Sequence, residues 1–395
     1  MMNVYSCTGK EASVRGRQKR REKLLMKKER NYSSYMRESG KRGRRRNPKL
    51  AGGIMLAGCL AALVLVVYLA GLLYMWLEKE IGRGKETSSG AVVGENVTYT
   101  QEELDIKIAE ATQTAAKSAS ARILDELKAG LSSGVTMVET LRPLYPDELV
   151  IVSNGVFNFV PIRDDLKKNA YLEENMNILE SGEIQYLENG QVISHKGIDV
   201  SKFQGEIDWN LVAQDGVEYA FIRVGNRGYG TGKLVEDEAF EANVEGALSA
   251  GLKVGVYMYT QAVNDAELLE EANFVLQKIA PYKIECPVVF DVEKVVGDNG
   301  RMNAISVEER TRLTKLFCDT IAAAGYKPMI YHNMEMGAMM LELSELQQYD
   351  KWFAYYNPDL YWPYEYQIWQ YTDKGRVNGI EGEVDLNISF APLWE

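Results

Sequence analysis

Histidine and cysteine are scarce in this chain. Its 395 residues include two histidines, His195 and His332, and four cysteines. Neither histidine stands at a ligand-like spacing from other metal-binding residues, which leaves little for a structural zinc site or a Ser-His-Asp triad. Four cysteines do not form a disulfide framework, and Cys286 and Cys318 lie in apolar segments where buried thiols are expected rather than a bridge. We therefore expect no metal and no other cofactor.

Acidic residues are in turn scarce at the N-terminal end. Residues 1–49 hold 17 Lys and Arg against 4 Asp and Glu, so the rest of the chain must carry a net −24 for the whole to reach −11. Lys and Arg collect on the cytoplasmic side of a membrane span, where anionic lipid heads attract them. We interpret 1–49 as a basic cytoplasmic tail in preference to a nucleic-acid-binding arm, and we expect no nucleic-acid partner.

Charge is absent altogether from the apolar run 51–77. Its length of about 27 residues exceeds the roughly 20 that cross the hydrocarbon core of a bilayer. The apolar region of a cleaved signal peptide is shorter, about 7 to 15 residues. We therefore predict a transmembrane helix over 50–77 that contacts the lipid bilayer through 51–77. It would make the chain a single-pass protein of the cell membrane, with a cytoplasmic N-terminus and an extracellular remainder.

The segments that follow differ in composition. Residues 78–100 are rich in Gly, Ser and Thr and indicate a flexible linker. Residues 101–133 hold no Pro and little Gly and predict a helical stalk. The apolar spacing of this stalk is too irregular to establish a coiled coil, so self-association through it stays open. Residues 143–195 contain two β-rich pairs around Ser153-Asn154-Gly155 and Asn189-Gly190, and they predict a small β-rich module without a motif that indicates its role.

From Lys196 onward, strand-like runs alternate with helical stretches, although little helix separates the last runs. Such alternation argues for a parallel sheet covered by helices, and hence for an α/β fold. We predict a closed TIM-like barrel over 196–395 that lacks its last helices. An open doubly wound sheet is the alternative, but the glycines of "GIDVSKFQG" are wrongly placed for a nucleotide-binding loop. The strand-like runs are 197–200, 219–224, 254–259, 288–292, 328–331, 351–356, 366–371 and 384–388.

Acidic residues stand at the ends of several of these runs. In a β/α barrel the catalytic groups sit at the carboxyl ends of the strands, and Asp199, Asp291 and Asp385 lie at or near such ends. Glu293 follows Asp291 by two positions, so both side chains should point to the same side, and crowding would raise the pKa of one of them. A general acid would then be available near neutral pH. Alone, "DVE" could equally be a solvated strand end, but acids at three separate strand ends favour a catalytic site.

Aromatic residues at the strand ends supply a second observation. Aromatic rings suit the apolar faces of sugars and carboxylates suit their hydroxyls, although core packing is the alternative for each aromatic singly. Without a nucleophilic Ser or Cys and its base, and without a metal cluster, the chemistry that remains for paired acids is glycoside hydrolysis. Tyr356 and Tyr371 follow the aromatic pattern. The substrate-binding candidates are Tyr257, Tyr259, Gln204, Arg223, Tyr331, Trp352, Tyr355, Trp369 and Gln370.

Six motifs occur in order between Lys196 and Phe390: "KGIDVSKFQGEIDW", "FIRVGNRGYGTG", "GLKVGVYMYTQA", "PVVFDVE", "WFAYYNP" and "IWQYTDKGRVNGIEGEVDLN". This series resembles the signatures of glycoside hydrolase family 25, the lysozyme-like N-acetylmuramidases. The resemblance implies an irregular (β/α)5(β)3 barrel. It also implies cleavage of the β-1,4 bond between N-acetylmuramic acid and N-acetylglucosamine in peptidoglycan.

The resemblance also assigns roles by position. It implies that Glu293 is the general acid and that Asp291 is its partner in the D-x-E motif. Asp199 matches the first-strand acid of the family, and Asp385 matches the acid of the final strand. The implied partner is the glycan strand of peptidoglycan.

Two positions depart from the family pattern. Met258 stands where many members have His, and Asn226 stands where an aromatic residue is common. Neither is an acid, so they bear on substrate preference more than on activity. The sequence thus predicts a membrane-anchored peptidoglycan hydrolase. Its alternative is an inactive barrel that binds glycans or acts as a scaffold; the loss of one acid would favour it, and all four acids are present.

Overall fold

The computed structural model describes residues 99–295, 297, 300–358 and 360–394. The predicted basic tail (1–49), the predicted membrane span (50–77) and nearly all of the predicted linker (78–100) lie outside these residues. Residues from Thr100 onward cluster into one compact unit, Thr100–Glu395.

The predicted location of the chain needs correction. Among the described residues, no helix combines the length and the apolar character that a membrane crossing requires. This finding contradicts the prediction of a single-pass protein of the cell membrane. The run 51–77, from which that prediction was made, is not part of the described structure.

A helix of 33 residues, α3 (Gln101–Ser133), lies where the sequence predicts one. Thr100 caps its start, because the Thr100 hydroxyl accepts the N–H of Glu103 while the Glu103 carboxylate accepts the N–H of Thr100. At the other end, Gly134 has a φ of 84°, the left-handed conformation that often ends a helix. No residue of α3 is buried. Its interpretation as a stalk, and self-association through it, stay predictions.

Both hairpins predicted within 143–195 are present. β1 (Glu148–Ser153) pairs antiparallel with β2 (Val156–Pro161). Asn154 and Gly155 connect them with φ values of 50° and 74°, as a tight two-residue turn requires. The second hairpin consists of β4 (Ile184–Glu188) and β5 (Gln191–Val192), joined by Asn189 and Gly190, with β3 (Met176–Ile178) on the other edge of β4.

This β-rich module shares a core with the domain that follows. Leu149 and Ile184 are buried and belong to the same hydrophobic cluster as the side chains of that domain. A short helix, α4 (Met137–Leu141), precedes the module, and Asn357 donates to Glu139 Oε1 of this helix at 3.0 Å. Because a fully buried aliphatic side chain stabilises a fold by about 1.5–3 kcal/mol, these contacts hold the module firmly against the domain.

Eight strands of that domain close into a barrel, which confirms the prediction and excludes the open sheet. The order is β6-β7-β9-β10-β11-β12-β13-β14, and β14 pairs with β6 to close the ring, while β8 extends the edge of β7. Neighbours from β6 to β13 are parallel, and β14 is antiparallel to both of its neighbours. The strands are β6 (His195–Val200), β7 (Tyr219–Arg227), β8 (Leu234–Glu236), β9 (Lys253–Tyr259), β10 (Val288–Asp291), β11 (Pro328–Asn333), β12 (Asp350–Ala354), β13 (Ile368–Gly375) and β14 (Val384–Ser389).

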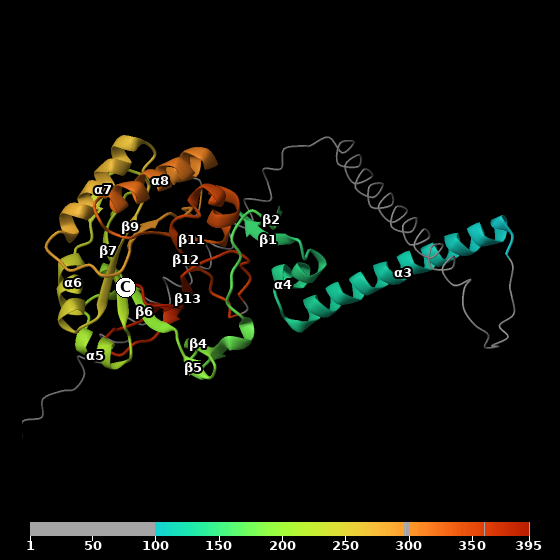
Figure 1. The fold of residues 1–395 in the computed structure, drawn as a ribbon, viewed down its shortest axis with the longest axis horizontal. Coiled ribbons are helices and arrows are strands. Elements are labelled where there is room, and N and C mark those ends of the chain that lie inside the picture. The colour runs from blue at the N-terminus through green and yellow to red at the C-terminus, as the bar shows by residue number, and fades with distance from the viewer. Residues whose placement is uncertain (1–98, 296, 298–299, 359, 395) are drawn as a thin grey trace, which may run out of the picture. The chain divides into compact units, whose positions relative to one another are not determined.

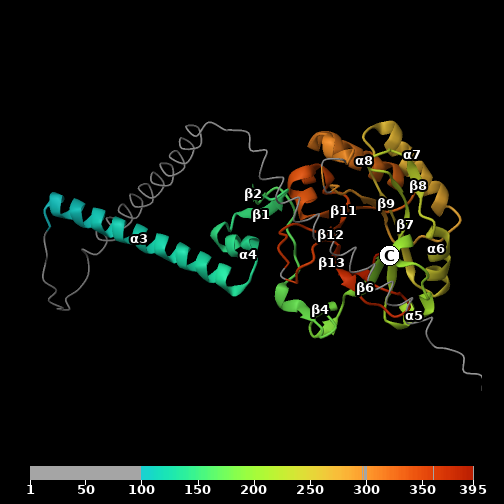
Figure 2. The ribbon, with the colours of Figure 1, turned by 180° about the vertical axis from the view of Figure 1, so that it is seen from behind.

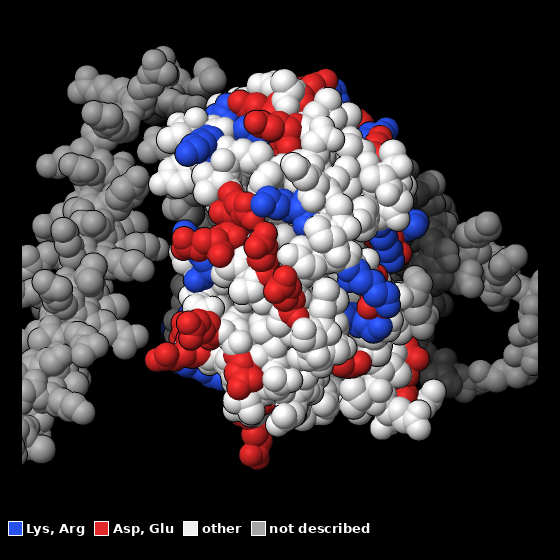
Figure 3. Space-filling view, turned by 90° about the vertical axis from the view of Figure 1, so that its left-hand side faces the viewer, with Lys and Arg blue, Asp and Glu red and all other residues white. Residues whose placement is uncertain are grey.

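Helices cover the outside of the first part of the barrel, as Figures 1 and 2 show from opposite sides. After β11, the only helical segments among the described residues are a short π-helix (Met336–Met340) and a 3-10 turn (Leu343–Leu346), which agrees with a barrel that lacks its last helices. The outer side that faces the viewer in Figure 3 carries charged side chains of both signs among uncharged ones, as a solvated helix face does. The helices are α5 (Trp209–Gln214), α6 (Phe240–Ser249), α7 (Asp265–Ile279) and α8 (Val307–Ala323).

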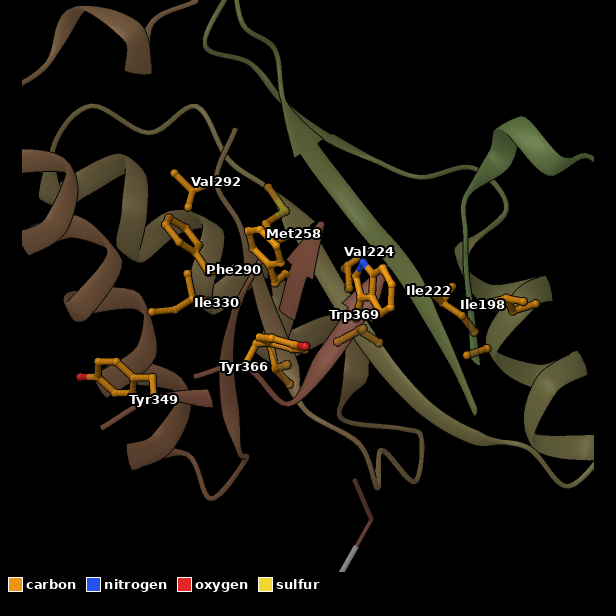
Figure 4. Close-up of a cluster of buried hydrophobic side chains, with 14 of the residues drawn as sticks. Ile198, Ile222, Val224, Met258, Phe290, Val292, Ile330, Tyr349, Tyr366 and Trp369 are labelled. Carbon is orange, nitrogen blue, oxygen red and sulfur yellow. The ribbon is translucent and has the colours of Figure 1, made fainter. Parts of the chain in front are cut away.

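Side chains of the barrel strands alternate between two buried layers. Outward-facing residues pack under the helices, in the cluster that Figure 4 shows. Inward-facing aromatic rings fill the barrel, and Phe221 stacks on Trp352 with ring centroids 4.7 Å apart. Gly197 makes room for one of these rings, because a Cβ there would lie 2.1 Å from Tyr219 Cζ. The filled interior leaves the carboxyl ends of the strands as the open end.

Candidate active site

A cavity of about 300 Å³ lies at the carboxyl ends of the strands, where barrel enzymes hold their catalytic groups. All four predicted acids and seven of the nine predicted substrate-binding residues line it. Within the described part of the chain, no group of three or more His, Cys, Asp or Glu is arranged to hold a metal ion. The lining residues are Asp199, Ser201, Phe203, Gln204, Arg223, Tyr257, Tyr259, Asp291, Glu293, Tyr331, Trp352, Tyr356, Gln370 and Asp385.

Two of the acids face each other across neighbouring strands. Asp199 near the end of β6 is the register partner of Asp385 on β14. Burial raises the pKa of Asp199 to about 6, although hydrogen bonds from Asn387 and Gln370 counteract the rise. Burial and the negative charge of Asp199 together raise the pKa of Asp385 to about 9. Asp385 is therefore the protonated member near neutral pH, and it hydrogen-bonds to the Asp199 carboxylate.

The other two acids lie at the carboxyl end of the strand β10. Asp291 is its last residue, and its buried Oδ1 has no hydrogen-bond partner. Burial raises the pKa of Asp291 well above its ordinary value; the charges of Glu293 and Asp199 add to the rise, and Arg223 opposes it. Burial likewise raises the pKa of Glu293, with a further contribution from Asp199 and an opposing one from the hydroxyl of Tyr331. This half of the cavity thus favours carboxyl groups that keep a proton.

Amide side chains orient the Asp199 carboxylate. Gln370 Nε2 and Asn387 Nδ2 both donate to Asp199 Oδ2 at 2.8 Å. The oxygen of Gln370 accepts the hydroxyls of Tyr331 and Tyr356, both at 2.8 Å. Each amide therefore has a defined orientation, with its NH2 group towards the acid.

Asn387 and Tyr356 are site residues that the sequence-based candidates omitted. Asn387 is fully buried, and its Oδ1 accepts the indole N–H of Trp352 at 2.8 Å. It stands two positions after Asp385 on β14, and residues two apart in a strand face the same side. This alternation could have predicted that Asn387 points the same way as Asp385. Tyr356 follows the pattern of aromatic residues at strand ends, but it is not among the predicted substrate-binding residues.

One cation lines the cavity, and it is already paired. Arg223 binds Asp237 Oδ2 through Nε at 2.7 Å and through Nη2 at 2.6 Å. Asp237 also accepts the backbone N–H of Lys202, at the start of the short 3-10 helix Lys202–Gln204. The same helix carries Phe203, which is 76% exposed and lies 4.9 Å from the Arg223 guanidinium carbon, measured to the ring centroid. The loop after β6 thereby presents an aromatic face at the rim, another residue that the candidates omitted.

Two substrate-binding candidates are not in this cavity. Trp369 is fully buried among the outward-facing residues (Figure 4), and its indole N–H donates to the backbone oxygen of Tyr355 at 2.8 Å. Adjacent residues of a strand face opposite sides, so Trp369 must point outward because Gln370 points inward. Trp369 as a substrate contact is therefore wrong. Tyr355 lines a neighbouring cavity instead.

The two departures from the family pattern also lie away from the cavity lining. Met258 is fully buried in the outward-facing cluster. Asn226, on β7, is not among the lining residues. Neither substitution changes the surface that a bound substrate would meet here.

Comparison with known proteins places this arrangement in a family. Residues 198–380 match the model of glycosyl hydrolases family 25. The uncharacterized protein YegX of Escherichia coli K12 is 30% identical over 206 residues, which are 49% of this chain and 68% of that protein. The chain belongs to glycosyl hydrolases family 25. Membership confirms the predicted resemblance and the glycoside hydrolase class.

Two further similar proteins match about half of the chain each. The autolytic lysozyme of Clostridium acetobutylicum is 30% identical over 195 residues, and the match covers 49% of this chain and 55% of that one. The chain thus spans about half the length of this relative. A family 25 glycosyl hydrolase from Bacillus anthracis, of known structure, is 24% identical with a TM-score of 0.44, covering 53% of this chain and 93% of that one. The family model ends before β14, so the match to it does not cover Asp385 or Asn387.

Proposed function

We propose that this chain is a peptidoglycan hydrolase that cleaves the β-1,4 bond between N-acetylmuramic acid and N-acetylglucosamine by carboxylate acid/base catalysis. The observation that carries the proposal is the gathering of four acids, with raised pKa values, in one cavity of a family 25 barrel. The name of the autolytic lysozyme relative supports the substrate class.

Glu293 is the proton donor in this proposal. Its raised pKa keeps the carboxyl protonated closer to neutral pH, as a general acid requires. The proton would pass to the glycosidic oxygen while the bond to the anomeric carbon breaks. The resulting carboxylate would then take a proton from the attacking water, which restores the starting state.

Asp199 is the better candidate for the ionised group. Its pKa of about 6 lies below that of Asp385, at about 9, and two amide groups hold its carboxylate in place. A fixed negative charge beside the anomeric carbon would stabilise the cation that develops there. The pKa of Asp291 is raised well above its ordinary value, so Asp291 is suited to donate a hydrogen bond that orients the 2-acetamido group of the substrate.

The test is cleavage of purified peptidoglycan by the full chain, followed by identification of the new reducing ends. We expect muramic acid ends from the wild type and a loss of at least about a hundredfold in rate for Glu293→Gln, the contribution typical of a general acid. Glu381→Gln, an exposed acid outside the cavity, is the matched control and should retain wild-type activity. A folded wild-type chain that binds glycan strands without releasing ends would instead support the inactive, glycan-binding alternative.

A further inference from the structure

A second cavity, of about 400 Å³, adjoins the candidate active site. The two cavities share Glu293, Tyr331 and Tyr356 as lining residues. Part of the second wall comes from the barrel, and part comes from α4, the turn after it and β1, which precede the family 25 match. The module without a recognised role thus provides part of the wall of a cavity that Glu293 also lines.

The wall of the second cavity is more apolar than the wall of the first. Aliphatic side chains provide much of it, among them Val138, Val150 and Val152 from the module side. The first cavity is instead lined by acids, amides and hydroxyls, which suit the polar groups of a sugar. A ligand of the second cavity should therefore carry small apolar groups.

Arg142 gives this apolar wall one positive charge. Its guanidinium lies 3.8 Å from the ring centroid of Tyr361 and donates from Nη2 to the Tyr355 hydroxyl. The Nε atom is buried and has no hydrogen-bond partner. A buried N–H of a cation without a partner is costly, and an anionic acceptor would satisfy it.

The acids near Arg142 are already engaged. Glu335 lines the cavity but accepts hydrogen bonds from Lys294 and from the Ser153 hydroxyl, the latter at 2.6 Å. Glu139 accepts the N–H of Thr136, as part of a capping box, and the amide of Asn357. Ser153 also accepts from Lys294 at 2.9 Å, which ties the β1–β2 turn to the loop that carries the catalytic acid candidate.

We propose that the second cavity binds the peptide stem of the substrate, with Arg142 receiving a stem carboxylate and the aliphatic wall receiving small side chains. The inference rests on the proposed function. In peptidoglycan, the muramic acid bears a lactyl group to which a short peptide of alanine and dicarboxylic residues is attached. A stem on the sugar beside Glu293 would extend into the adjoining cavity. A further sugar of the glycan strand is the rival occupant, but the aliphatic wall offers few groups for its hydroxyls.

The test compares two substrates and a pair of charge variants of the full chain. The substrates are glycan strands with their peptide stems and the same strands after an amidase has removed the stems. Val152 lines the cavity and is 42% exposed, so the fold should accept Val152→Lys and Val152→Glu. On stemmed strands we expect kcat/KM to be about three- to tenfold higher for Lys than for Glu, the range of one partly exposed charge pair. On bare strands the two variants should agree within about twofold, because no stem carboxylate is present.

Controls separate this proposal from general charge effects and from the proposed function. Val156, at the other side of the turn and 61% exposed, is outside the cavity lining, so Val156→Lys and Val156→Glu should not differ on either substrate. If Arg142 binds a stem carboxylate, the wild type should cleave stemmed strands with a higher kcat/KM than bare strands. Arg142→Met should lose this preference, and Arg142→Lys should keep part of it.

Equal rates for the two Val152 variants on stemmed strands, or the same difference on bare strands, would overturn the proposal that the second cavity binds the stem. If the wild type cleaves neither substrate, the proposed hydrolysis fails, and calorimetric binding of a soluble stem peptide to the same variants decides the stem site by itself.

Discussion

Replacing Asn387 by Leu tests whether the amide network holds the Asp199 carboxylate. Leu has a similar volume, so the cavity should stay filled, but both hydrogen bonds of the amide are lost. Asn387 Nδ2 donates to Asp199 Oδ2 and Asn387 Oδ1 accepts the Trp352 indole N–H, each at 2.8 Å. A hydrogen bond to a charged group contributes about 1.5–3 kcal/mol, and an unpaired buried donor costs about 1–3 kcal/mol. We therefore expect the free energy of unfolding to fall by about 3 kcal/mol at pH 7.

The loss should depend on pH in a defined direction. Folding raises the pKa of Asp199 from an ordinary 3.8 to about 6, so the neutral form is favoured in the folded state. The stability that this group contributes is present at low pH and is lost as the pH rises through about 6. The hydrogen bond from Asn387 lowers this pKa, and its removal must raise it further. At pH 4.5 Asp199 is mostly neutral in wild type and variant alike, so its lost hydrogen bond is one to an uncharged carboxyl group. Only the part of the loss that depends on the charge should disappear, and about 1–2 kcal/mol should remain.

Urea unfolding at pH 4.5 and pH 7 measures both values. Ile388→Val is the matched control, because Ile388 is the next residue of the same strand and faces the opposite layer. Deletion of one methyl group there should cost about 0.5–1.5 kcal/mol at both pH values. A loss in Asn387→Leu that is equal at the two pH values would refute the argument that the amide stabilises an ionised Asp199.

Three other changes have defined outcomes. Gly197→Ala should lower the free energy of unfolding by more than about 3 kcal/mol in thermal or urea unfolding, since its Cβ would lie 2.1 Å from a ring atom inside the barrel. Glu271→Leu should cost about 1–3 kcal/mol, because Arg227 Nε loses its buried acceptor while the guanidinium keeps its ion pair with Glu270, and adding Arg227→Met should restore part of the loss. Asp199→Asn removes a charge that raises the pKa of Glu293, so the alkaline limb of the kcat/KM profile, or an NMR titration of labelled Glu if activity is too low, should move to lower pH.

The strands and the four acids could be predicted because each depends on local pattern. Apolar runs marked the strands, and the rule that barrel sites gather at carboxyl strand ends placed Asp199, Asp291 and Glu293. Asp385 lies at the amino end of β14 instead, and it reaches the same end of the barrel because β14 is antiparallel to its neighbours. The direction of single side chains was harder to predict. Both faces of these strands are buried, so polarity does not mark which face points inward. Trp369 and Gln370 are neighbours in such a strand, and both were assigned to the substrate, although alternation allows only one.

The packing of the β-rich module shows a second limit. Its hairpins were predicted from Asn-Gly turns, because such turns act over a few residues. Its position beside Glu293 depends on contacts such as Ser153 with Glu335, between residues 182 apart in the chain. No local sequence pattern predicts such a contact, so the second cavity could be recognised only in the three-dimensional structure.

The carboxyl groups of the candidate active site favour their protonated forms. Four acids line it, and its one cation, Arg223, already pairs with the buried Asp237. Four ionised carboxylates in so small a buried space would repel one another strongly, and each would also lose its hydration. The shifts follow from this conflict: Asp385 keeps a proton against Asp199, and the second pair, Asp291 and Glu293, is driven the same way. A cavity that must hold protons at neutral pH costs stability, and the acid catalysis proposed above would give these protons a use.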